Sequence, residues 1–210
     1  MIHTSRRFGV FAASVSAAVV AAALVAPAAQ AVTLDFDSQG GTVANGYGGL
    51  DWANFYTLDA TTYDASGYVN GLVSPKLVAL NGFGNPASIS GSGFTLNSGY
   101  FTAAWNDGLT VDAQGFVGGV LTFSKTFVID TAGPTLEAFN WANLSGVTFT
   151  SSGGVSHGYN GGGEHFALDN LTVNESGAVP EPASWALMLG GFGMVGGAMR
   201  ARRRTAVAFG

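Results

Sequence analysis

The sequence contains no cysteine in its 210 residues, which excludes a disulfide framework, a thiolate metal site and a cysteine nucleophile. Positive charge is also scarce in the middle of the chain, because six of the eight basic residues are arginines near the two ends. Residues 32–178 carry twelve acidic side chains against only Lys76 and Lys125, a formal charge of −10. Nothing in this segment neutralises a row of phosphates, so nucleic acid is excluded as a partner.

Signatures of catalysis are missing as well. The sequence has no H-E-x-x-H motif or phosphate-binding loop. Its acidic residues offer many arbitrary pairs, but no single pair is marked out for glycoside hydrolysis. We therefore expect a protein without enzymatic activity, with a secreted hydrolase as the alternative.

The pattern of residues 32–178 predicts an all-β domain. No window keeps a helical period, and several short runs alternate apolar and polar residues between Gly, Asn, Asp or Ser: Thr33–Asp37, Lys76–Leu80, Gly93–Leu96 and Val147–Thr150. Two more strands are expected at Leu109–Asp112 and Leu121–Ile129, with breaks at Ala113–Gly115 and Gly118–Gly119. About nine or ten short strands favour a two-sheet, jelly-roll-like β-sandwich. A β-helix is the rival, but the sequence shows no fixed repeat.

The first 31 residues predict a secretory signal peptide. Arg6 and Arg7 precede an uncharged stretch rich in Ala and Val at 8–26, and Ala29 and Ala31 supply a small-x-small cleavage site. Cleavage after Ala31 leaves Val32 as the mature N-terminus, with the secretion translocase and signal peptidase as partners. A retained membrane anchor is the alternative for the same stretch.

The C-terminal segment, residues 179–204, predicts a transmembrane helix oriented by charge. A Pro-Glu-Pro run lies within 179–182, a 17-residue apolar stretch follows at 183–199, and an arginine cluster ends the segment at 200–204. Seventeen helical residues extend about 26 Å, close to the ~30 Å hydrocarbon core. The arginines hold the distal end in the cytoplasm, so residues 32–178 face outward.

The same segment resembles a PEP-CTERM sorting signal of the PEPxxWA subclass. The resemblance rests on Pro180, Glu181, Pro182, Trp185 and Ala186, on the Gly-Phe-Gly at 191–193, and on Arg200, Arg202, Arg203 and Arg204. It implies that an exosortase in the inner membrane recognises Pro-Glu-Pro, with 183–199 as a temporary anchor and the arginines as a stop-transfer cluster. Residues 205–210 form a tail past the usual end of such signals, and an ordinary C-terminal anchor is the alternative.

Blocks of the middle segment also resemble ectodomains that often precede this signal. These blocks lie at 48–59, 82–108 and 165–175. Such ectodomains are loosely similar to carbohydrate-binding jelly rolls, which implies a fold more than a function.

Acidic residues of the first and last predicted strands form a candidate calcium site. In residues 165–173 the apolar phase slips by one at Asp169 and Asn170, which predicts a bulge there. Jelly-roll modules commonly bring the first and last strands together, and this would place both residues beside Asp35 and Asp37. Calcium selects carboxylate and amide oxygens of this kind. The alternative is a set of solvated acids at a sheet edge.

Aromatic residues with polar neighbours form a candidate glycan site. Trp52 and Trp105 offer rings that can stack on a sugar face. Asn106 and Asp107 offer hydrogen bonds to sugar hydroxyls. Core packing is the alternative for the two rings.

A third candidate is a transition-metal site in the glycine-rich loop at 157–165. His157, Glu164 and His165 provide two imidazoles and a carboxylate. The sequence places no further strong ligand beside them, so an ordinary loop with incidental histidines is the alternative.

These features predict an exported, exosortase-processed surface or extracellular-matrix protein with an inner-membrane intermediate. Its acidic domain is expected to bind an extracellular polysaccharide or another glycan. A purely structural matrix protein without a specific ligand is the alternative.

Overall fold

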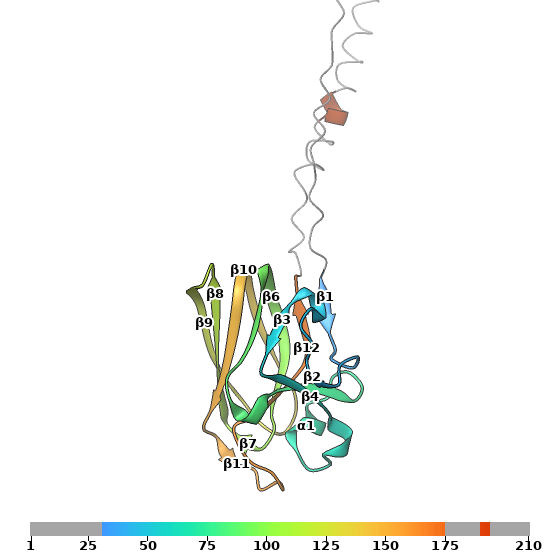
Figure 1. Cartoon of the computed structure of the whole chain (residues 1–210), viewed down its shortest axis with the longest axis vertical. Helices are drawn as coiled ribbons and strands as arrows, with labels where there is room; N and C mark the ends of the chain where they lie inside the picture. Colours follow the sequence, from blue (N-terminus) through green and yellow to red (C-terminus); the bar gives the residue numbers. More distant parts are fainter. Residues whose placement is uncertain (1–30, 175–189, 194–210) are drawn as a thin grey trace, which may run out of the picture.

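Antiparallel strands make up most of the part of the chain that the computed structural model describes, residues 31–174 and 190–193 (Figure 1). The strands are β1 (Val32–Leu34), β2 (Gly41–Thr42), β3 (Asp51–Ala53), β4 (Phe55–Asp59), β5 (Leu77–Asn81), β6 (Ala87–Ala103), β7 (Asn106–Asp107), β8 (Leu109–Val117), β9 (Val120–Ile129), β10 (Thr135–Ser152), β11 (Val155–Ser156) and β12 (Phe166–Val173). Four short helical elements join them: η1 (Tyr47–Gly49), η2 (Ala60–Thr62), α1 (Gly67–Asn70) and η3 (Gly82–Gly84).

Hydrogen bonds join ten of these strands into one ladder. Its order is β2-β4-β5-β12-β6-β10-β8-β9, with β1 added to β12 and β3 added to β6. β7 and β11 form a separate two-stranded sheet. The two longest strands, β6 and β10, pair over residues 87–101 and 135–149 with three register shifts, and so form the centre of the ladder.

The ladder is folded over on itself, as ring contacts across the core show. β4 and β10 stand four positions apart in the strand order, about 19 Å in a flat sheet. The ring centroids of Phe55 on β4 and Phe149 on β10 nevertheless lie 6.3 Å apart. Phe101 on β6 and Phe127 on β9 are three positions apart, and their centroids lie at 5.1 Å. The two halves of the ladder therefore face each other across a shared core, which confirms the predicted all-β sandwich.

Phenylalanine rings fill much of this core. Among the largest fully buried side chains are Phe36, Phe55, Phe101, Phe149 and Phe166. The rings of Phe55, Phe101 and Phe149 meet Phe166 in edge-on or tilted contacts. Each fully buried phenylalanine stabilises the fold by roughly 1.5–3 kcal/mol, so the aromatic cluster is a principal source of stability.

The predicted break at Ala113–Gly115 is wrong, because β8 runs through these residues, although its pairing with β9 shifts register just after Gly115. Gly115 fits inside the strand for a packing reason: a Cβ at this position would lie 2.8 Å from the Trp141 ring. The predicted break at Gly118–Gly119 is confirmed as the turn between β8 and β9, where both glycines have positive φ (56° and 81°).

The first and last strands of the domain lie side by side. Val32 is opposite Val173 and Leu34 is opposite Leu171 in an antiparallel pair. Figure 1 shows β1 and the end of β12 at one end of the domain, with β7, β11 and α1 at the other. The two ends of the described domain therefore leave it from the same side.

Several predicted features lie outside the described residues. These are the signal peptide with Ala29, most of the predicted transmembrane helix, and the sorting residues Pro180, Glu181, Pro182, Trp185, Arg200, Arg202, Arg203 and Arg204. Within 31–174 and 190–193, no helix is long and apolar enough to cross a membrane.

Candidate functional site

The side chain of Asp169 is hydrogen-bonded to the loop that precedes β5. Its carboxylate is buried, with the whole residue 1% exposed. Oδ2 accepts hydrogen bonds from the N–H groups of Val73 (2.8 Å) and Ser74 (2.9 Å), while Oδ1 accepts from Ser74 Oγ (2.9 Å) and Asn170 N–H (2.8 Å). Burial raises the pKa of Asp169 even though these four donors act to lower it. The ladder shifts register just after Asp169, and Asn170 has φ 47°, so the predicted bulge is confirmed.

Asp35 and Asp37 lie near this loop, but their carboxylates accept hydrogen bonds from other groups. Asp37 Oδ1 accepts from Leu77 N–H at 2.9 Å. Asp35 Oδ1 accepts from the Tyr47 hydroxyl at 3.3 Å. Among the described residues there is no group of three or more His, Asp or Glu side chains that could together hold a metal ion. The carboxylates of Asp35, Asp37 and Asp169 each accept hydrogen bonds from different protein groups, and a calcium site at Asp35, Asp37, Asp169 and Asn170 stays a prediction.

The two tryptophans of the predicted glycan site lie in the interior. Trp52 is 6% exposed, donates its indole N–H to Tyr47 O at 3.0 Å and meets the Phe55 ring edge-on. Trp105 is 8% exposed, and Gly161 lies against its ring so closely that a Cβ there would come within 2.5 Å. Core packing therefore accounts for both rings, and neither face is open for stacking on a sugar.

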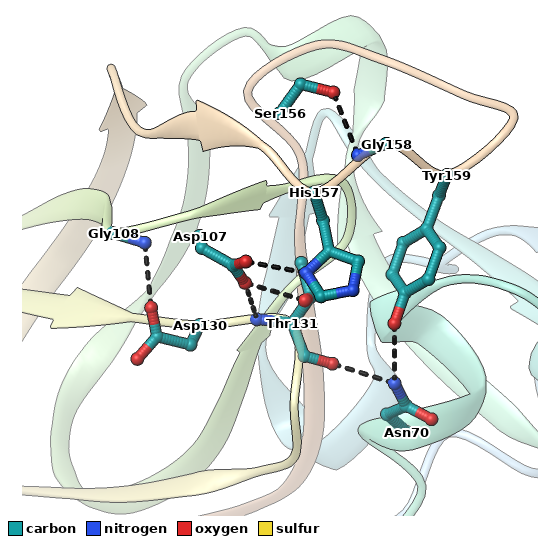
Figure 2. A network of polar contacts seen from close by, with 9 residues as sticks. All are labelled: Asn70, Asp107, Gly108, Asp130, Thr131, Ser156, His157, Gly158 and Tyr159. Carbon is teal, nitrogen blue, oxygen red and sulfur yellow. Dashed lines mark hydrogen bonds and ion pairs between the residues drawn. The ribbon is translucent and has the colours of Figure 1, made fainter.

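Asp107 lies at the centre of a polar network that ties several loops together (Figure 2). Its Oδ1 accepts from Thr131 N–H (3.0 Å) and Thr131 Oγ1 (2.6 Å), while Oδ2 lies 2.6 Å from His157 Nδ1. The hydrogen bonds from Thr131 and His157 lower the pKa of Asp107 to about 2. Both oxygens of this predicted glycan contact are thus occupied within the protein.

The same network reaches α1 and the 155–159 loop. Asn70 Nδ2 donates to Thr131 O at 2.8 Å and to the Tyr159 hydroxyl at 3.4 Å. The Tyr159 ring lies 4.2 Å from the His157 ring between centroids. Asn106, the other predicted polar contact, donates to Gly153 O at 3.0 Å. The arrangement in Figure 2 fixes loops at the end of the domain opposite to β1.

The predicted transition-metal residues have separate partners. His157 pairs with Asp107, and Glu164 Oε1 accepts from Gly153 N–H at 2.6 Å. His165 Nδ1 lies 3.2 Å from Asn81 O. The two histidines and the glutamate are therefore divided between different parts of the loop.

A surface pocket that the sequence did not reveal lies beside η3. Its volume is ≈ 290 Å³, and its walls are Tyr56, Thr57, Leu58, Leu80, Gly82, Phe83 and His165. Phe83 is 80% exposed and its ring centroid lies 6.0 Å from that of Tyr56, edge-on. No other described large hydrophobic residue is exposed to this degree.

The loop that carries Phe83 is held by two asparagine side chains. Asn54 Nδ2 donates to Gly82 O (3.1 Å) and Pro86 O (3.1 Å). The fully buried Asn81 donates to Asn85 O at 3.2 Å. Phe83 itself has φ 57° and ψ 20°, a left-handed conformation that is costly for a residue with a Cβ. The only signal in the sequence was an aromatic residue between two glycines in a turn.

His165 supplies a neutral polar group to the pocket. Burial lowers its pKa, so the imidazole is neutral at pH 7. Because a carbonyl oxygen only accepts, its contact with Asn81 O places the ring proton on Nδ1 and leaves Nε2 as an acceptor.

Comparisons with known proteins bear on the two parts of the chain separately. Curated protein sequences give no significant match. Among solved structures, the domain is similar to that of TmCBM61 in complex with β-1,4-galactotriose, with 6% identity and a TM-score of 0.36 over 67% of this chain and 97% of that one. With so low an identity and TM-score, the ligand of that structure says nothing about a ligand of the present chain.

Residues 178–204 match the PEP-CTERM protein-sorting motif. The match covers the Pro-Glu-Pro run, the apolar stretch and the arginine cluster that the sequence singled out. The chain therefore carries a PEP-CTERM protein-sorting motif, which implies export, membrane anchoring before surface release, and processing by an exosortase.

Proposed function

We propose that this chain is a surface or extracellular-matrix protein whose exported β-domain binds an extracellular glycan. The observation that carries the proposal is the sorting motif at 178–204, which is separated from the end of the described domain at Asn174 by only three residues. Processing at both ends of the chain would leave the sandwich intact, because its first and last strands are already paired.

The position of the motif also orients the domain. Pro180 is six residues beyond Asn174, so a fully extended chain between them spans at most ~21 Å. The β1 and β12 end is thus kept near the membrane while the chain is anchored. The opposite end, with β7, β11 and α1, faces away from it (Figure 1).

Glycan binding is supported by the pocket at Phe83. Its walls combine the largely exposed Phe83 ring with other apolar side chains and a few neutral polar groups, a composition common in ligand pockets. The acidic charge of residues 32–178 favours an uncharged partner over an anionic one.

The test combines location and binding. Cells with and without the exosortase are fractionated, and the mature protein is applied to immobilised neutral and anionic polysaccharides. Surface or extracellular location together with retention on a polysaccharide supports the proposal. Retention on none of them, with correct location, reduces the protein to a structural matrix component.

A further inference from the structure

We propose that Phe83, Tyr56 and His165 form a subsite for an uncharged sugar ring of an extracellular polysaccharide. This inference rests on the proposed function, since it names the site and the ligand class through which the exported domain would bind. It differs from the tryptophan site that the sequence predicted, whose rings are buried.

The first reason is that the Phe83 ring is exposed and its backbone conformation is energetically unfavourable. Its ring is exposed to water, and its backbone is left-handed, a conformation that L-residues with a Cβ rarely adopt. Residues held in such conformations cluster at ligand sites, where the surrounding structure enforces them. Here the enforcing groups are the Asn54 and Asn81 amides, which bond the carbonyls of the same loop.

The second reason is the shape of the wall next to Phe83. Gly82 is required there, because a Cβ would lie 2.4 Å from the Tyr56 ring. The Tyr56 ring therefore closes over the loop backbone and meets Phe83 edge-on. The result is an open aromatic platform with a second ring at its side, a shape suited to the apolar face of a pyranose.

The third reason is the chemistry of the lining. None of the seven lining residues is Asp, Glu, Lys or Arg. The polar side chains in the lining are neutral: the imidazole of His165 and the hydroxyls of Tyr56 and Thr57. Of these, Thr57 Oγ1 already donates to Gly41 O at 3.3 Å. A few neutral hydrogen-bonding groups among apolar walls suit hydroxyls and not carboxylates or sulfates. The pocket volume of ≈ 290 Å³ suits one sugar ring of a longer chain.

The fourth reason is the position of the subsite in the anchored protein. His165 directly precedes β12, and Val173 at the far end of β12 pairs with β1 next to the membrane side. Eight strand residues separate the two by roughly 25 Å. The subsite therefore lies away from the membrane-proximal end, where an extracellular polysaccharide can reach it.

The experiment measures binding of the mature protein to soluble neutral polysaccharides (a glucan, a galactan and a mannan) and to anionic alginate. The variants are Phe83→Ala, Phe83→Tyr, and Tyr63→Ala as a matched control that removes an exposed aromatic ring (44%) outside the pocket. We expect Phe83→Ala to weaken binding to a neutral polysaccharide at least tenfold with an unchanged unfolding midpoint. Phe83→Tyr and Tyr63→Ala are expected to bind like the unsubstituted protein.

The outcomes separate the two proposals. Neutral-glycan binding that survives Phe83→Ala overturns the subsite but leaves the proposed function standing. Binding only to alginate overturns the uncharged ligand class. Absence of binding to every polysaccharide overturns both. Equal loss in Phe83→Ala and Tyr63→Ala also contradicts the subsite, because it points to a general effect of removing surface aromatics.

Discussion

The Asp169 carboxylate holds Ser74 through two hydrogen bonds, one from its N–H and one from its Oγ, each 2.9 Å long. This buried contact joins β12 to the loop before β5 across 95 residues of sequence. Two of the acids predicted as calcium ligands, Asp169 and Asp37, therefore hold residues 73–77 in place by accepting hydrogen bonds from their backbone N–H groups.

We expect Asp169→Ala to lower the free energy of unfolding by about 1–3 kcal/mol, because it leaves the N–H groups of Val73 and Ser74 without their acceptor. Chemical denaturation measures this, with the exposed Asp64→Ala as a control expected to change little. The loss should be the same in calcium and in chelator. A calcium-dependent stabilisation that disappears in Asp169→Ala would restore the calcium hypothesis.

The left-handed backbone at Phe83 predicts a difference between two substitutions that both remove the ring. Phe83→Gly should be more stable than Phe83→Ala by roughly 1 kcal/mol, because only glycine adopts this conformation without steric cost. Denaturant unfolding of both variants measures the difference. Equal stabilities would mean that the loop relaxes out of the left-handed region in solution.

The lowered pKa of Asp107 predicts acid sensitivity. The carboxyl has a pKa of about 2 in the fold against an ordinary 3.8, so its contribution to stability is present above the ordinary value and is lost as the pH falls towards about 2. Between pH 4 and pH 2, the unfolding midpoint of Asp107→Asn should fall less than that of the unsubstituted protein. Parallel pH profiles would show that the Thr131 and His157 contacts do not hold in solution.

Glycines in the strands mark the limit of what the sequence could predict. The alternation of apolar residues was enough to predict an all-β sandwich, and the phase slip at Asp169 was enough to predict a bulge. Gly115 suggested a break, yet it lies inside β8 because the Trp141 ring covers it from β10. Contacts of this kind join residues far apart in the chain, and local pattern does not report them.

Gly115→Ala tests that explanation. A Cβ there would lie 2.8 Å from the Trp141 ring and 3.1 Å from Leu144, so we expect a loss of roughly 1–3 kcal/mol in unfolding free energy. Gly162→Ala is the control, since a Cβ at that position meets nothing within 4 Å. If the two variants are equally stable, the close packing over Gly115 is not a constraint on the strand.

The candidate site was hidden for the same reason. Trp52 and Trp105 were predicted as sugar contacts because large aromatic rings can stack on sugar faces. Burial of such rings also stabilises a hydrophobic core, and both tryptophans lie in the interior. Phe83 sits in a short Gly-Phe-Gly turn whose exposure depends on Asn54, 29 residues earlier in the chain. Only the folded loop shows that this ring faces solvent.

Mass spectrometry of the mature protein, from its native host and from the same host without the exosortase, tests the account most directly. We predict a product that begins at Val32 and ends near Pro180 only when the exosortase is present. Without the enzyme, residues 183–204 should remain attached and the chain should stay in the inner membrane. A product that keeps residues 183–204 in both hosts would make the C-terminal segment an ordinary anchor and contradict the account.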